Sequence, residues 1–271
     1  MKNESVYIPS QVLISRKKFG IFFLSLLVIV LACIYINFNP ILFFTEFHYL
    51  SDLVDEMMPP NYQVIWNDSN TLNTIGQTIS MAFLGTLIGG IISLFVSFFA
   101  ASITMNFGLV RWLITAMISL IRSVPSIVFI LIFIIAVGIG PFAGVLTLIF
   151  TTIGTFGKLF TEMLEHTDRA SSEGVSSVGA SKMQMVRYAI LPEVQPTIIS
   201  NFLYAFDINL RTAISLGIFG GGGLGYQLYM AVRVLHYKDV MALIIIIVCL
   251  VISIEKFSDW LRSIIFKQGN L

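Results

Sequence analysis

Six long apolar runs, separated by shorter polar stretches, dominate the hydrophobic pattern of this chain. They cover approximately residues 19–37, 72–104, 110–138, 142–164, 194–217 and 239–258. A helix of about 20 apolar residues crosses the ~30 Å of hydrocarbon in a bilayer. A helix also satisfies every backbone hydrogen bond within its own segment, as lipid requires. The pattern therefore predicts an all-α membrane protein with about six transmembrane helices.

The composition supports a lipid environment and argues against metal or cofactor chemistry. Of the 271 residues, 56% are hydrophobic and 11% are charged, whereas a soluble domain carries about 25% charged residues. The two cysteines lie singly in apolar runs and the three histidines are scattered, so no metal-ligand spacing is present. We expect no metal and no cofactor. The first apolar run exceeds the ~7–15 residues of a signal-peptide core, so it is read as a retained span.

The distribution of Lys and Arg predicts the orientation of the spans. Basic residues cluster in the tail 1–18 and in the segment after the fourth run, whereas residues 38–71 contain acidic residues and no Lys or Arg. Because cytoplasmic loops carry the excess of Lys and Arg, both termini are predicted to be cytoplasmic. The predicted organisation is a cytoplasmic tail over 1–18, a first span with an acidic extracytoplasmic loop over 19–71, a transmembrane domain over 72–266 and a short tail over 267–271.

The third run has an unusual first half. Arg111, Thr115, Ser119 and Arg122 recur at helical spacing and form a polar stripe. Pro125 then breaks the hydrogen-bond ladder of a helix. The stretch 108–122 either lies at the inner membrane interface before a shorter span or forms the inner half of a kinked span.

A polar segment, residues 165–193, separates the fourth and fifth runs. Ser181 and Gln184 have the spacing of a capping box, which predicts a helix over 182–189. Gly179 can adopt a positive φ and turn the chain between this helix and a shorter one over 173–178. Leu191-Pro192 is expected to end the second helix. The reading is a helix, a tight turn and a helix, exposed on the cytoplasmic side and suited to docking another protein.

This segment resembles the EAA loop of ABC-importer permease subunits through the spacing E-x5-G-x11-L-P. The chain departs from the family pattern at Gly174, Val175 and Ala189. The resemblance implies contacts with an ATPase subunit. The residues it implicates are Glu173, Gly179, Ala180, Met183, Leu191 and Pro192.

Three other stretches, 122–128, 137–165 and 204–240, are similar to the permeases of phosphonate importers. The resemblance implies a type I ABC importer permease core in a bacterial cytoplasmic membrane, translocating phosphonate, or a phosphate- or phosphite-like anion, by alternating access. It also implies a homodimer of the permease, an ATPase dimer and an extracytoplasmic solute-binding protein as partners. The chain itself is expected not to be an enzyme, because no G-x-x-x-x-G-K-[ST] motif for ATP is present.

Two charges fall inside the fifth run. Asp207 and Arg211 are four residues apart, so they meet on one helix face. They either form a structural ion pair or place Arg211 on an anion pathway, where its planar guanidinium suits phosphorus oxyanions. Asp207 is read as the one carboxylate deep in a span. Asn209 and Arg122 complete the candidate pathway residues.

The stretch 217–227 is rich in glycine. It is an extracytoplasmic turn, an irregular re-entrant segment lining a cavity, or a place where small residues let helices approach closely. The glycines concerned are Gly220, Gly221, Gly222, Gly223 and Gly225.

Two other functions compete with the importer. An ion-coupled secondary transporter would use the Asp207–Arg211 pair directly, although the hydropathy shows no evident inverted repeat. An intramembrane enzyme would need a catalytic motif such as G-x-S-x-G or H-E-x-x-H, and the sequence contains neither.

Overall fold

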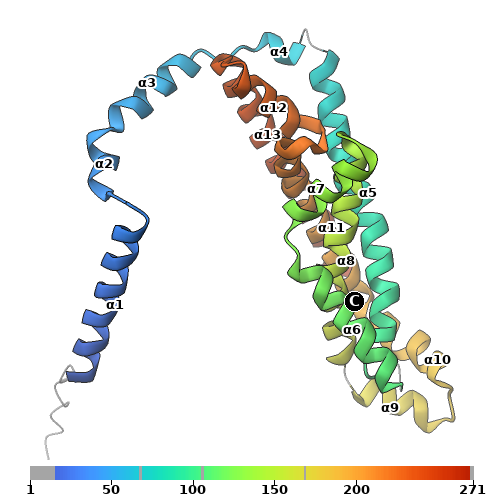
Figure 1. Cartoon of the computed structure of the whole chain (residues 1–271). Helices are drawn as coiled ribbons and strands as arrows, with labels where there is room; N and C mark the ends of the chain where they lie inside the picture. Colours follow the sequence, from blue (N-terminus) through green and yellow to red (C-terminus); the bar gives the residue numbers. More distant parts are fainter. Residues whose placement is uncertain (1–15, 67–68, 105–106, 168, 269–271) are drawn as a thin grey trace, which may run out of the picture. The chain divides into compact units, whose positions relative to one another are not determined.

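The computed structural model describes residues 16–66, 69–104, 107–167 and 169–268, and every regular element in these ranges is a helix. The chain divides into two units, Met1–Asp55 and Glu56–Leu271. Figure 1 shows the helices in chain order. The elements are α1 (Arg16–Tyr35), α2 (Pro40–Thr45), α3 (Phe47–Met57), α4 (Gln63–Trp66), α5 (Ser69–Ala100), α6 (Gly108–Ser123), α7 (Ser126–Val137), α8 (Pro141–Glu165), α9 (Arg169–Ser177), α10 (Lys182–Met185), η1 (Val186–Ile190), α11 (Leu191–Leu216), η2 (Gly217–Gly221), α12 (Gly223–Arg233) and α13 (Tyr237–Gln268).

The first unit holds the predicted first span and much of the predicted acidic loop. The apolar part of α1, Gly20–Tyr35, is slightly shorter than the roughly 17 residues at which spans usually begin. The predicted acidic loop contains short helices. Asn39 caps α2 by accepting a hydrogen bond from the backbone N–H of Ile41 at 3.0 Å, and the amphipathic helix α3 follows.

The second unit contains four helices that are long and apolar enough to span a membrane, as judged from the described residues. They are Asn70–Ala100, Pro141–Glu165, Val186–Gly221 and Tyr237–Ile265. The bent pair α6 and α7 makes a fifth span if it is counted as one. All of these coincide with predicted apolar runs, so the all-α membrane fold is confirmed.

The predicted break in the third run lies at Val124–Pro125. Helices α6 and α7 meet there at 90°. Val124 has an extended backbone with φ −87° and ψ 122°, because the ring of a following proline disfavours the helical conformation. Pro125 has no N–H to continue the ladder of α6 and instead precedes the first turn of α7.

Glycines allow the central helices to approach closely. A Cβ on Gly85 of α5 would lie 2.4 Å from the Cβ of Leu148, and one on Gly89 would lie 2.8 Å from the Cβ of Thr152. Both contacts join α5 to α8, and Gly90 similarly admits the ring of Phe202 from α11. Small residues four apart are typical of tightly packed membrane helices, whose association relies on close van der Waals contact. These three helices form the centre of the bundle.

Candidate functional site

The polar segment between α8 and α11 has the predicted turn and capping box. Gly179 has φ +82° and follows α9. The backbone N–H of Ser181 donates to Gln184 Oε1 at 2.8 Å, and the N–H of Gln184 donates to Ser181 Oγ at 3.4 Å. This reciprocal pair is the capping box that opens α10. Helix α9 begins at Arg169, earlier than the predicted 173.

The prediction that Leu191-Pro192 ends the second helix is wrong. Helix α10 continues through the π-helical turn η1 into α11, and the N–H of Leu191 donates to the carbonyl of Val186. Pro192 lies in the first turn of α11, a position where the missing N–H of proline is tolerated. The backbone hydrogen bonds just before it are those of the wider π turn. The segment and the fifth span are therefore continuous helix.

Two buried residues anchor this continuous helix in the bundle. Ile190 is fully buried and Ala189 is 8% exposed. Ile190 packs in a cluster with Ala101, which follows α5, and Leu164 near the end of α8. The segment thus lies at the end of the bundle where α5 and α8 finish (Figure 1). In the sequence Ala189 stands out only as a departure from the family pattern, and sequence reasoning did not identify either residue as an anchor.

The residues implicated by the motif lie mainly on the surface of this segment. Glu173, Gly179, Leu191 and Pro192 are exposed and Ala180 is half-buried. The Met183 side chain lies outside the described residues. An exposed motif above a buried anchor suits contact with another protein, because docking leaves the packed core undisturbed.

The glycines of the Gly-rich stretch are buried. Gly217 and Gly220 to Gly225 are all buried. Gly220, Gly222 and Gly223 have positive φ, a conformation that glycine adopts without the steric penalty of a Cβ. The chain folds back so that a Cβ on Gly225 would meet the carbonyl oxygen of Ile214 at 1.8 Å. Close backbone approach explains these glycines.

The same stretch borders a cavity of about 410 Å³. Gly222 and Gly223 line it together with polar side chains from α5, including Thr74 and Gln77. The Gln77 side chain accepts a hydrogen bond from the backbone N–H of Gly223 at 3.3 Å. The expectation of an irregular segment beside a cavity is therefore consistent with the geometry, as is close helix approach.

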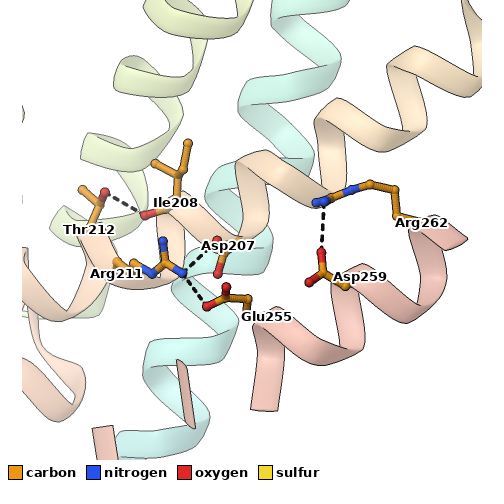
Figure 2. A network of polar contacts seen from close by, with 7 residues as sticks. All are labelled: Asp207, Ile208, Arg211, Thr212, Glu255, Asp259 and Arg262. Carbon is orange, nitrogen blue, oxygen red and sulfur yellow. Dashed lines mark hydrogen bonds and ion pairs between the residues drawn. The ribbon is translucent and has the colours of Figure 1, made fainter. Parts of the chain in front are cut away.

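Asp207 and Arg211 form the predicted ion pair, and a second carboxylate joins them. Arg211 Nη2 lies 3.1 Å from Asp207 Oδ2 and 2.9 Å from Glu255 Oε2 on α13 (Figure 2). Asp207 is 8% exposed and its Oδ1 atom has no hydrogen-bond partner among the described residues. The reading of Asp207 as the one carboxylate deep in a span is wrong. Glu255 lies within the sixth apolar run, so its charge could have identified it from the sequence as a second carboxylate in a span.

We expect Arg211→Gln to destabilise the protein, because it leaves Asp207 and Glu255 without their shared cation. Breaking a fully buried ion pair costs roughly 3–5 kcal/mol of folding free energy. The loss of stability should be smaller here, because the Arg211 side chain is 49% exposed. Thermal unfolding of the purified protein measures this. The triple variant with Asp207→Asn and Glu255→Gln should recover much of the stability. Normal stability with lost uptake would instead assign Arg211 to the pathway.

Arg122 and Asn209 line one cavity of about 290 Å³, between α6, α7, α8 and α11. The Asn209 side-chain amide donates to Thr86 Oγ1 at 2.8 Å and to Thr152 Oγ1 at 2.9 Å. Residues 207 and 211 face α13, whereas residue 209 is about 200° around the helix from residue 207 and faces the cavity. The four candidate pathway residues thus separate into a cavity pair and an ion pair.

A bundle of apolar helices with a polar cavity and an exposed helical segment at one end defines a polytopic membrane protein. The chain belongs to the family described as "Binding-protein-dependent transport system inner membrane component", whose model matches residues 93–268. The protein is accordingly a membrane transport component.

Several named proteins are similar to this chain. The "Phosphite transport system permease protein PtxC" of Stutzerimonas stutzeri is 32% identical, over 87% of this chain and 85% of that protein. The "Phosphate-import permease protein PhnE" of Mycolicibacterium smegmatis is 33% identical over 86% of this chain, which spans only 44% of that protein. The "Putative cryptic phosphonate transport system permease protein PhnE2" of Escherichia coli is 35% identical, over 44% of this chain and 97% of that protein.

Solved structures share the fold. A chain of the inward-facing MetNI methionine ABC transporter superposes with a TM-score of 0.63 and 21% identity, covering 72% of this chain and 95% of that chain. A chain of a bacterial ABC transporter involved in alginate import gives a TM-score of 0.62 and 13% identity, covering 92% and 98%. At these identities the likeness establishes the fold alone, and this fold is the one expected from the resemblance.

Proposed function

We propose that this chain is the membrane-spanning subunit of an ATP-driven importer for small phosphorus oxyanions: phosphonate, phosphite or phosphate. The observation that carries the proposal is the likeness to the phosphite permease over most of both chains. The substrate class comes from the names of the relatives, which cover all three anions. Two copies of this chain, an ATPase dimer and an extracytoplasmic binding protein would complete the importer.

The helical continuity described above supplies a mechanical route for alternating access. A docked ATPase would push on α9 and α10, and η1 would pass the displacement directly into α11 without an intervening flexible loop. Helix α11 carries Asn209, which borders the cavity. A shift of one packed helix against its neighbours can switch which side of a membrane site is open. This chain would thus convert the motion of a separate ATPase into opening and closing of the pathway.

The proposed orientation places α9 and α10 in the cytoplasm with both chain termini. The basic residues of this segment, which include Arg169, Lys182 and Arg187, support it. The exposed motif would then face the ATPase, while the opposite end of the bundle would face the binding protein.

Reconstitution of this chain with its ATPase and binding protein in liposomes tests the proposal. We expect uptake of radiolabelled phosphite, methylphosphonate or phosphate that requires both the binding protein and ATP hydrolysis. Uptake that persists without ATP and follows a proton or sodium gradient would refute it and favour the ion-coupled secondary transporter.

A further inference from the structure

The cavity at the α6–α7 break is open at the surface of the chain, where Arg122 and Thr155 are exposed, and its inner wall is polar, with Asn209 and Thr152 buried. Asn209 joins it to Thr86, near the middle of the 32-residue helix α5, and to Thr152, near the middle of the 25-residue helix α8. Polar groups at this depth are expensive unless they are paired or face a water-filled space. A polar wall at this position can therefore face a water-filled space or a polar solute.

The charge of the cavity favours an anion. Arg122 lines it, and no Asp or Glu is among the lining residues. In the described part of the chain Arg122 forms no ion pair, unlike Arg211 and Arg262. A guanidinium presents five N–H donors in a planar fork that matches two oxygens of a phosphorus oxyanion.

The neutral lining residues add hydrogen-bond donors. The Thr152 hydroxyl accepts from Asn209 at 2.9 Å, so its own proton is directed away from that amide and is free to be donated. Ser126 and Thr155 also line the cavity. Ser126 is the first residue of α7, a 12-residue helix with no side-chain cap, so the positive end of the helix dipole lies at the same wall. The cavity wall thus offers several donors, as a ligand with only acceptor oxygens requires.

We infer that Arg122, Ser126, Thr152 and Thr155 form a binding subsite for a tetrahedral phosphorus oxyanion inside the permease, with Asn209 as a positioning residue. The inference rests on the proposed function and deepens it, because the permease would select its cargo in addition to the binding protein. The cavity volume of about 290 Å³ is near the lower end of the ~300–1,000 Å³ range of ligand pockets, which suits a small anion.

Equilibrium binding to the purified permease–ATPase complex, without binding protein, tests the subsite. The probes are radiolabelled phosphate, phosphite and methylphosphonate, each used alone in a maltoside detergent that contains no phosphate. We expect Arg122→Gln to weaken binding about 10- to 100-fold, as for loss of hydrogen bonds to a charged group. Thr152→Val should weaken it less, and Arg122→Lys should retain part of the affinity.

Arg111→Gln is the matched control. Arg111 lies on the same polar stripe of α6 as Arg122 but does not line the cavity, so its loss should leave binding unchanged. Each variant is first checked for normal yield and ATPase association, so that misfolding is not read as lost binding. Equal weakening by both glutamine variants would mean that net charge, and not the subsite, attracts the anion.

A lipid headgroup offers the same phosphate chemistry, and a second readout separates it from the free anion. Mass spectrometry of phospholipid retained by the complex should be the same for wild type and Arg122→Gln. Reduced lipid retention with unchanged binding of the soluble anions would overturn the subsite, as would failure of the wild-type complex to bind any of the three probes. If the complete importer with Arg122→Gln or Thr152→Val still took up the anions normally, the subsite would be refuted but the proposed function would stand. If the wild-type importer took up none of the oxyanions, the proposed function itself would be refuted.

Discussion

Gly225→Ala should prevent the helical bundle from reaching its normal stability. An added Cβ at this position would lie 1.8 Å from the carbonyl oxygen of Ile214 and 2.8 Å from its carbonyl carbon. Both atoms belong to the backbone of α11, so no side-chain rotation can relieve the overlap, and α12 would have to move away from α11. Overpacking a well-packed site costs about 1–3 kcal/mol, and a backbone clash should lie at or above the top of that range.

The measurement is the thermal unfolding midpoint of the purified protein, together with the amount inserted in the membrane. Gly76→Ala in α5 is the matched control, because a Cβ there would meet no heavy atom within 4 Å. Alanine is the better helix former by about 1 kcal/mol, so this variant should be at least as stable as wild type. Equal midpoints for the two alanine variants would show that α12 is not packed against α11 in the membrane.

The apolar runs predicted most of the fold because membrane helices can be recognised from local sequence. A span needs only length and hydrophobicity, so the amino-acid sequence alone is enough to locate α5, α8, α11 and α13. The turn at Gly179 and the capping box at Ser181 were equally local, since each depends on residue types a few positions apart.

What could not be predicted depends on contacts between distant parts of the chain. The partner of Arg211 is Glu255, 44 residues away, and no local pattern indicates which helix will face α11. The continuity of α10 with α11 was missed for a related reason. Leu191-Pro192 is usually a helix boundary, but the π turn η1, with Ile190 held in a buried cluster, keeps the chain helical.

The candidate pathway residues illustrate both cases. Asp207 and Arg211 were recognised as a pair from their spacing alone, and they form one. Arg122 and Asn209 are far apart in the sequence, and only the packing of α6 and α11 around one cavity brings them together. Spacing therefore identified the ion pair, whereas the proposed anion subsite needed the tertiary structure.

Gly179→Val should abolish ATP-coupled import while the protein still folds and inserts. Gly179 has φ +82°, a conformation that costs an L-residue about 1–2 kcal/mol and a β-branched one more. A Cβ there would meet nothing within 4 Å, so the effect comes from the backbone and not from crowding. Valine would drive φ negative and swing α9 relative to α10, which would displace the exposed motif from the ATPase subunit that we propose it contacts.

Two matched variants test this explanation. Gly179→Asn should retain much of the transport, because asparagine tolerates a positive φ better than other residues with a Cβ. Gly174→Ala lies within α9, where an added Cβ meets nothing within 4 Å, and it should transport normally. Co-purification of the ATPase and ATP-dependent uptake in liposomes are measured for all three. If the asparagine and valine variants both lost transport, the ATPase contact would require the absence of a side chain at residue 179 and not the turn itself. Normal ATP-coupled transport by Gly179→Val would show that the bend at Gly179 has no role in the mechanism.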